Sequence, residues 1–145
     1  MISHHRRNLN RVLATMLPLP GRSLEIGNGR VRRGLDLGAS VTLDFAYGRR
    51  PSVQADAHHL PFADGMFQTV ACCETLQYTD SPTWIMREIG RVTERWGRVL
   101  LSVPMLQRRD HPTDRARFSA CDAVELMESF AGLRVTRLFR LSNAL

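Results

Sequence analysis

Lysine is absent from this chain of 145 residues, so arginine supplies all 20 of its basic side chains, against 14 acidic ones. The arginines run from Arg6 to Arg140 instead of gathering in one stripe, and aromatic residues make up only 7% of the sequence. Nucleic-acid-binding surfaces concentrate basic residues on one face or along one helix. A net charge of +6 dispersed in this way is typical of a solvated surface, so we expect no nucleic-acid partner.

Long hydrophobic runs are missing as well. No stretch approaches the roughly 18 apolar residues that a membrane span needs. Charged residues come early, at positions 4–7, and the N-terminus lacks the apolar segment and small-residue cleavage site of a signal peptide. We therefore expect a cytoplasmic protein without a membrane span.

Cysteine is scarce, and its spacing excludes the common cysteine-based metal sites. Cys72, Cys73 and Cys121 form no C-x-x-C pair. Cys72 and Cys73 are adjacent in an apparent strand, so they should point to opposite faces as small buried side chains in a reducing compartment.

Short apolar runs alternate with helical patterns along the whole chain, which is typical of an α/β fold. We expect residues 1–20 to form an N-terminal helix and linker, and residues 21–145 to form one domain. The expected helices cover 3–16, a short weak stretch within 30–38, 82–92 with Ser81 as N-cap, and 119–131 with a capping box at Ser119. The expected strands cover 24–26, 41–45, 52–56, 67–73, 98–103 (as a central strand) and 133–141. This order predicts a Rossmann-like, doubly wound, mostly parallel sheet with helices on both faces.

The first strand runs into a turn with two glycines, Gly27 and Gly29. Glycine lacks a Cβ, so the backbone of such a turn can lie directly against a ligand. A tight corner without function is the alternative, because a strand followed by Gly-x-Gly is common.

Acidic residues follow several of the other predicted strands. Ligands of open α/β sheets bind beyond the carboxyl ends of the strands, where Asp44, Asp56 and Glu74 are expected. Asp44 can accept hydrogen bonds from both ribose hydroxyls of a nucleoside, and Asp56 can accept one from an adenine amino group. Each acid alone is equally well explained as a cap of a turn or helix.

The order of these segments resembles the class I S-adenosylmethionine-dependent methyltransferases, in particular the ubiquinone-biosynthesis-type (methyltransferase type 11) group. The resemblance covers residues 23–139. The matching segments are Glu25-Ile-Gly-Asn-Gly29, Asp44, Ala55-Asp-Ala-His-His-Leu-Pro-Phe-Ala-Asp-Gly-Met-Phe67, Glu74-Thr-Leu-Gln-Tyr78, Arg87-Glu-Ile-Gly-Arg-Val92, and His111-Pro-Thr-Asp114 with Arg117-Phe-Ser119. The adjacent His58 and His59 fall on positions that vary in this family, so we predict no metal site.

The resemblance implies a binding site for S-adenosyl-L-methionine and a methyl transfer to a small-molecule acceptor. The residues implied for the cofactor are Glu25, Gly27, Asn28, Gly29, Asp44, Phe45, Asp56, Ala57, Cys73 and Glu74. Candidates for orienting the acceptor are Tyr78, His111 and Arg117. An ion pair of Arg117 with Asp114 that only braces the loop is an equal alternative.

Several positions depart from the family pattern. Val31 stands where a third glycine is frequent, Trp96 replaces a glycine of the turn before the fifth strand, and Tyr78 replaces a histidine. A nicotinamide-binding domain fits less well, because its third glycine position holds Arg32. We expect the sheet to lack the usual last strand, with homodimerisation or the N-terminal helix covering its exposed edge. A catalytically silent relative that serves as a binding or regulatory partner is the alternative function.

Overall fold

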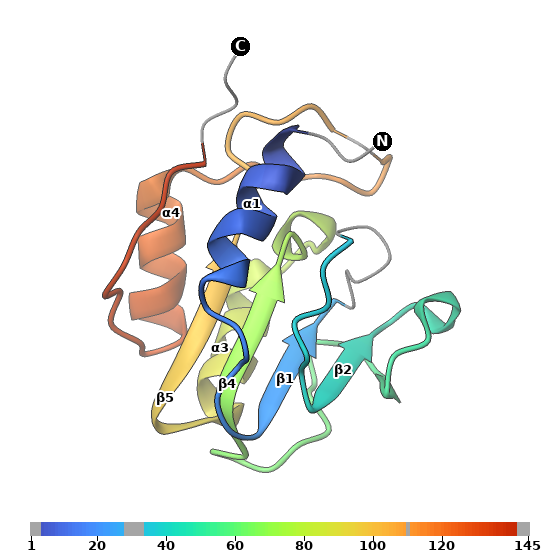
Figure 1. Cartoon of the computed structure of the whole chain (residues 1–145), viewed down its shortest axis with the longest axis vertical. Coiled ribbons are helices and arrows are strands. Elements are labelled where there is room, and N and C mark those ends of the chain that lie inside the picture. The colour runs from blue at the N-terminus through green and yellow to red at the C-terminus, as the bar shows by residue number, and fades with distance from the viewer. Residues whose placement is uncertain (1–3, 28–33, 110, 142–145) are drawn as a thin grey trace.

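The computed structural model describes residues 4–27, 34–109 and 111–141 of the chain. The described residues form three α-helices and five strands, and among them β1 to β4 follow one another without an α-helix between them (Figure 1). The strands are β1 (Ser23–Ile26), β2 (Val41–Asp44), β3 (Val53–Gln54), β4 (Phe67–Cys73) and β5 (Thr93–Ser102). The helices are α1 (His4–Ala14), α3 (Pro82–Val92) and α4 (Ala120–Glu125), and a π-helical turn over Leu126–Phe130 continues α4. Single 3-10 turns cover Tyr47–Arg49 and Leu76–Tyr78.

All five strands are parallel and lie in the order β3-β2-β1-β4-β5. The strand order reverses beside β1, which pairs with β2 on one side and with β4 on the other. This arrangement confirms the predicted doubly wound α/β fold. The prediction of a central fifth strand is wrong, because β5 pairs only with β4 among the described residues and forms the edge of the sheet.

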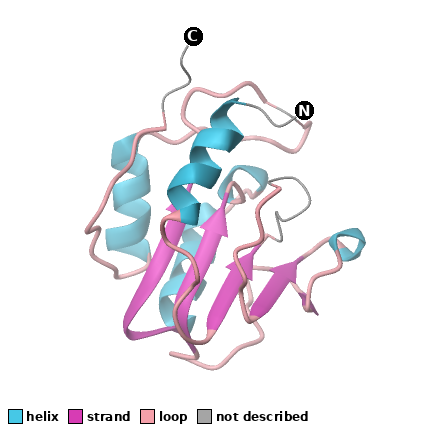
Figure 2. Cartoon of the chain, viewed as in Figure 1, coloured by secondary structure: helices cyan, strands magenta, loops and turns pink. Residues whose placement is uncertain are grey.

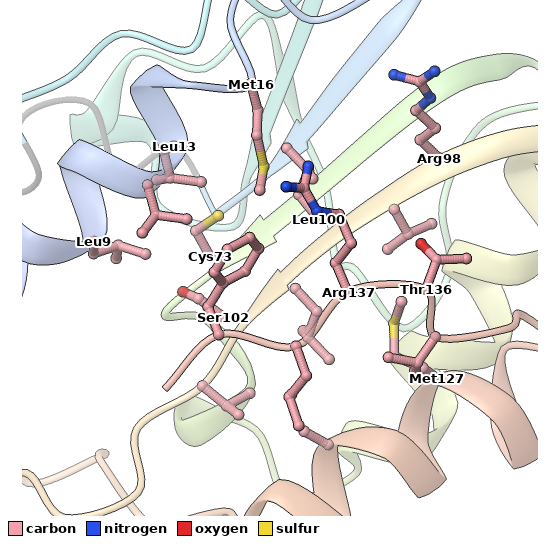
Figure 3. A pocket seen from close by; sticks show the side chains of 18 of the residues that line it. Leu9, Leu13, Met16, Cys73, Arg98, Leu100, Ser102, Met127, Thr136 and Arg137 are labelled. Carbon is pink, nitrogen blue, oxygen red and sulfur yellow. The ribbon is translucent and has the colours of Figure 1, made fainter. Parts of the chain in front are cut away.

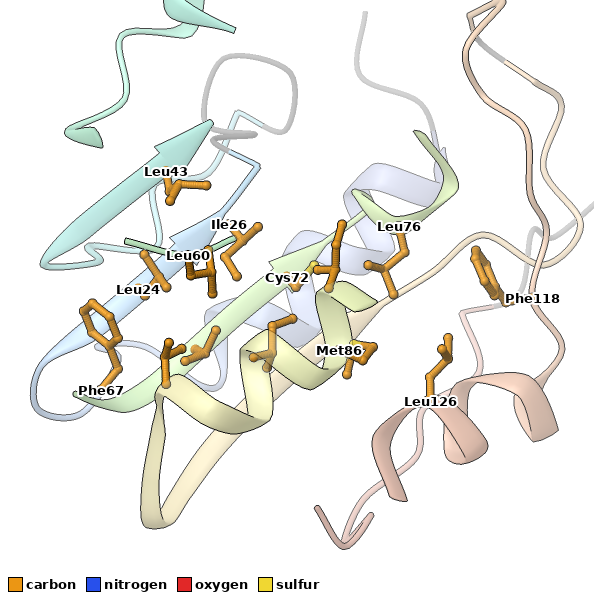
Figure 4. Packing of buried hydrophobic residues seen from close by; sticks show 14 residues of the cluster. Leu24, Ile26, Leu43, Leu60, Phe67, Cys72, Leu76, Met86, Phe118 and Leu126 are labelled. Atoms are coloured by element: carbon orange, nitrogen blue, oxygen red, sulfur yellow. The ribbon is translucent and has the colours of Figure 1, made fainter. Parts of the chain in front are cut away.

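Helices cover both faces of the sheet (Figure 2). One face packs against α3 and α4 through a cluster that includes Phe67, Met86 and Leu126 (Figure 4). The other face packs against α1, whose Leu9 and Leu13 join a cluster with Ala71 and Cys73. Fully burying one such large apolar side chain contributes about 1.5–3 kcal/mol, so both helical layers are needed to hold the sheet.

The two adjacent cysteines confirm the alternation expected of a buried strand. Cys72 belongs to the cluster under α3 and Cys73 to the cluster under α1, and neither forms a disulfide bond within the described residues. Burial raises the pKa of the Cys72 thiol well above its usual value. A low-dielectric surrounding disfavours the thiolate, so Cys72 is a packing residue.

The helix starts agree with the sequence at α4 and differ in detail at α3. Ser119 caps α4 in a full capping box, in which Ser119 Oγ accepts from Asp122 N and the Asp122 carboxylate accepts from Ser119 N. Ser81 precedes α3, which begins at Pro82 as predicted, but its side chain makes no capping hydrogen bond. Ser81 instead donates its backbone N–H to Thr79 Oγ1 at 3.0 Å.

Residues 133–141 correct the prediction of a last strand. The segment has no ladder partner among the described residues and forms neither strand nor helix. It follows α4 back along the sheet beside β5 (Figure 1), and both segments line one cavity instead of pairing with each other. Alternating apolar residues make a strand only where a neighbouring backbone supplies hydrogen bonds.

Two further predicted elements, the third strand and the weak helix within 30–38, are shorter in the structure than expected or not formed in the described residues. The third strand covers only Val53–Gln54, so Asp56 lies in the loop beyond it. Of the weak helix expected within 30–38, residues 30–33 lie outside the described residues and residues 34–38 are not helical. Gly34 and Gly38 have φ values of 71° and 64°, a left-handed conformation that does not continue a helix.

Candidate functional site

The carboxyl ends of β3, β2, β1 and β4 bring most of the described candidate residues into one row. Ladder-like hydrogen bonds continue just past the strands: Gly27 N donates to Leu43 O at 2.8 Å, and Ala55 N donates to Asp44 O at 3.2 Å. On the far side of β4, Glu74 N donates to Ser102 O at 3.0 Å. The sheet order therefore places Asp56, Asp44, Gly27 and Glu74 side by side, as the sequence predicts.

Gly27 is required by its conformation and by its contact with Thr75. Its φ is 75°, and a Cβ added there would lie 2.1 Å from Thr75 Oγ1. The Thr75 hydroxyl in turn lies 3.3 Å from Ile26 O and 3.2 Å from Cys73 O, so it joins the ends of β1 and β4. Asn28, Gly29 and Val31 lie outside the described residues.

The acids of the row differ in accessibility. Asp44 is buried at the end of β2, where its Oδ1 accepts from Ala46 N at 2.8 Å. Glu25 is only 1% exposed, within β1. Asp56 keeps about half of its side chain exposed (52%), and the backbone N–H and ring of His58 hold the pKa of its carboxyl below the usual value. Asp56 is thus an ionised acceptor that remains open to a ligand.

An exposed aromatic ring adjoins Asp44. Phe45 comes directly after β2 and is 76% exposed, although phenylalanine is usually buried. A carboxylate acceptor, an open ring and a second carboxylate beyond the next strand fit the hydroxyls, base and amino group of a nucleoside. Among the residues that the structure describes, no group of three or more His, Cys, Asp or Glu could hold a metal ion.

Glu74 lies in a strained backbone position at the end of β4. Its φ is 53°, which costs a non-glycine residue about 1–2 kcal/mol. Ser102 Oγ donates to Glu74 Oε1 at 3.2 Å, and His5 Nε2 of α1 lies 3.7 Å from the same oxygen. The sequence analysis missed His5 and Ser102. Of these two, only Ser102 could have been found from the sequence, because it lies near the end of a predicted strand.

The loop after Asp56 is clamped to α3. Glu88 Oε2 accepts from Leu60 N at 2.7 Å, and Arg91 donates to Leu60 O at 3.0 Å, to Phe62 O at 2.8 Å and to Asp64 Oδ1 at 2.8 Å. Arg91 also forms two hydrogen bonds to Glu88, at 2.7 and 2.9 Å, which hold the pKa of the Glu88 carboxyl below its usual value. The Leu-Pro-Phe segment and the Arg-Glu-x-x-Arg segment are thus two halves of one clamp.

The acceptor candidates lie on two loops beyond β4 and β5. Tyr78 ends the 3-10 turn after Glu74 and is half-buried. His111 is exposed and pairs locally with the Thr113 hydroxyl at 2.8 Å. Arg117 is bound on all sides: it forms an ion pair with the buried Asp114 and donates to Gln107 O at 2.9 Å. These contacts favour the bracing alternative for Arg117.

A cavity of about 1510 Å³ opens between α1, β5 and residues 133–141 (Figure 3). Leu9 and Leu13 of α1 and Met16 just after it face the cavity from one side, and Leu100 and Ser102 of β5 face it from the other. Cys73 and Glu74 also line it, so the cavity meets the row of strand ends at β4. Arg98 and Arg137 add positive charge to a mainly apolar wall.

Comparison with known proteins identifies the family and fold. A family model described as a methyltransferase domain matches residues 26–101, just over half of the chain. No curated protein matches the sequence. No helix of the described residues is long and apolar enough to cross a membrane.

Several solved structures share the fold at low sequence identity. A possible histamine N-methyltransferase of Thermotoga maritima is 22% identical with a TM-score of 0.68, and the match covers 89% of this chain and 72% of that one. A Haloferax volcanii methyltransferase, solved in complex with the activator Trm112, is 21% identical with a TM-score of 0.65 over 92% of this chain and 70% of that one. The [4+2]-cyclase SpnF is 24% identical with a TM-score of 0.63 over 88% of this chain and 56% of that one.

Proposed function

Since the chain belongs to the methyltransferase domain family, we propose that it binds S-adenosyl-L-methionine at the row of strand ends and methylates a small molecule. The observation that carries the proposal is the row itself: two carboxylates, an exposed phenyl ring and a left-handed glycine lie at or just beyond the carboxyl ends of adjacent parallel strands. When bound, the cofactor supplies an activated methyl group, and the protein aligns the partners.

The family resemblance suggests a role for each of these residues. Asp44 holds the ribose hydroxyls, and Phe45 lies against the adenosine. Asp56 and the backbone of Ala57 hold the adenine ring. Glu25, together with Gly27, Asn28 and Gly29, holds the methionine end. Cys73 and Glu74 lie where the row meets the cavity, so they lie nearest the transferred group.

The cavity beside α1 is the proposed acceptor site. Its walls select a mainly apolar molecule, because Leu9, Leu13 and Met16 form one side of it. Tyr78 and His111 on the neighbouring loops are proposed to orient the acceptor. The volume of about 1510 Å³ exceeds the roughly 300–1,000 Å³ of an ordinary ligand pocket, and the space is bounded on one side by the edge strand β5.

A second copy of the chain is the proposed cover for that edge, in a cytoplasmic enzyme. α1 packs on the face of the sheet and leaves the outer backbone of β5 without a ladder partner among the described residues. A strand with free N–H and C=O groups readily pairs with another chain. Sedimentation of the protein at micromolar concentration tests this: a monomer would contradict it.

A catalytically silent binding or regulatory protein remains the alternative. One observation favours it: the strained Trp96, with φ 69°, stands at the position of a family glycine. Fold does not determine chemistry. A partner protein along the edge of β5 would then replace the second copy.

Calorimetry with S-adenosylmethionine and S-adenosylhomocysteine tests the proposed function. The folded protein should bind both, and Asp44→Ala should weaken binding by tenfold or more, because about 1.5–3 kcal/mol is typical for hydrogen bonds to a charged group. Glu125→Ala, an exposed acid on α4, is the matched control and should bind like the wild type. Absence of binding by the folded wild type would refute the enzyme reading, and unchanged affinity of Asp44→Ala would refute the ribose assignment.

A further inference from the structure

His58 links the candidate adenine site to the start of α3 through a continuous chain of hydrogen bonds. Its Nδ1 lies 2.6 Å from Asp56 Oδ1, and its Nε2 lies 2.7 Å from Thr79 Oγ1. The backbone N–H of His58 donates to the same Asp56 oxygen at 2.9 Å. Thr79 Oγ1 also accepts from the backbone N–H of Ser81, the residue directly before α3.

The donors and acceptors of this hydrogen-bond network follow when Asp56 is ionised and the imidazole ring is neutral. An ionised carboxylate only accepts, so Nδ1 of His58 carries a proton. In the neutral ring Nε2 then accepts from the Thr79 hydroxyl, whose oxygen already accepts from Ser81 N. Every polar atom of the histidine ring is therefore used, and its orientation is set from both ends.

Both contacts from His58 go to Oδ1 of Asp56, which leaves Oδ2 as the oxygen for a ligand. The Asp56 side chain is 52% exposed and would otherwise sample several rotamers. His58 is 28% exposed and holds the carboxylate in one of them. A fixed acceptor binds a directional donor more tightly than a mobile one, because less entropy is lost on binding.

We propose that His58 is a positioning residue that aims Asp56 Oδ2 at the adenine amino group of the cofactor and ties this acceptor to α3. The inference rests on the proposed function. This role explains why His58 makes short contacts to Asp56 and to Thr79 at the same time.

The adjacent His59 provides a matched control. Its side chain is exposed, and its ring makes an edge contact with Trp84 at 6.2 Å between centroids. His58→Phe removes both side-chain hydrogen bonds and keeps a ring, whereas His58→Asn keeps a donor near the position of Nδ1. Thr79→Val removes the far end of the chain without touching Asp56.

The test measures the affinity of each variant for S-adenosylhomocysteine and for its deaminated analogue S-inosylhomocysteine, which lacks the amino group. The wild type should prefer the amino compound, and His58→Phe should lose roughly three- to tenfold of that preference, as expected for one hydrogen bond. His59→Phe should keep the preference, and His58→Asn should restore part of it. A general loss of structure would instead weaken the binding of both ligands equally.

The outcomes separate this inference from the proposed function. If the folded wild type binds neither ligand, the proposed function fails. If it binds both and His58→Phe keeps the full preference, the positioning role of His58 is refuted while the proposed function stands. If the wild type shows no preference, the adenine assignment of Asp56 and the role of His58 fall together. If His58→Phe does not fold, Thr79→Val serves as the test instead, because it should also lower the preference for S-adenosylhomocysteine, and an unchanged preference would refute the role of His58.

Discussion

Replacing Arg91 by lysine should destabilise the protein by about 2 kcal/mol, although the charge is kept. The guanidinium reaches both oxygens of Glu88 and the carbonyls of Leu60 and Phe62 at once. An ammonium group cannot span this set, because its three donors leave a single atom. The two loop carbonyls are the main loss, at about 1 kcal/mol each for a net hydrogen bond.

The ion pair to Asp64 adds little to this figure. Asp64 is 82% exposed, and exposed pairs contribute about 0–1 kcal/mol. Arg91→Ala should cost more, about 3–5 kcal/mol, because it also leaves the largely buried Glu88 carboxylate without its cation.

Urea unfolding followed by circular dichroism measures the effect. With a slope of about 1–3 kcal/mol per molar urea, a loss of 2 kcal/mol moves the midpoint by roughly 1 M. Arg95→Lys is the control, since Arg95 is exposed and lies only over the exposed ring of Trp96. A change below about 0.5 kcal/mol for Arg91→Lys, the range of ordinary surface substitutions, would refute the clamp.

Two further predictions concern the acid side of the clamp and the glycine turn. Arg91 lowers the folded-state pKa of Glu88, so the stabilisation is present above the unfolded value of about 4.3 and is lost as the pH falls through the folded pKa. Urea midpoints of Glu88→Gln should therefore lie below those of the wild type at pH 7 and approach them on acidification, and parallel curves would contradict this. Gly27→Ala should cost more than about 2 kcal/mol from its left-handed φ and its overlap with Thr75. In a Thr75→Ala background the cost should fall toward about 1–2 kcal/mol, and thermal melts showing simple additivity would contradict the contact.

The parallel sheet could be predicted from the sequence because its strands are short buried runs with polar residues at their ends. Phe67–Cys73 is buried at every position except Gln68, as its apolar run indicates. Residues 133–141 instead mostly alternate apolar and polar side chains, a pattern that also predicts a strand, and still form none. Pairing depends on whether another backbone lies within hydrogen-bonding distance, and a single segment carries no information about that.

The candidate site, too, could be predicted only in part from the sequence. Asp44, Asp56 and Glu74 could be placed because each lies at or just after the end of a strand. The partners that orient them, His58 for Asp56 and Ser102 with His5 for Glu74, come from elements that meet only in the folded chain. The Arg-Glu-x-x-Arg segment could be matched to the family from the sequence, but the sequence did not show what the segment does. In the structure, Glu88 and Arg91 of this segment bind the loop after Asp56.

The two ends of the proposed site are held by different means, and this difference bears on what the protein selects. The loop that carries Asp56 is tied directly to α3 through Leu60 and through the carbonyl of Phe62, and His58 ties it to Thr79, which bonds Ser81 directly before α3. Such preorganisation suits a ligand that is always the same, because little ordering remains to be done on binding. The cavity at the far end is walled by apolar side chains of α1 and by residues 133–141, which join no strand ladder among the described residues. Apolar contacts are not directional, so this end can accept molecules of several shapes. We therefore expect affinity for the adenosine group to survive most changes in α1, while the choice of acceptor should follow Leu9, Leu13 and Met16.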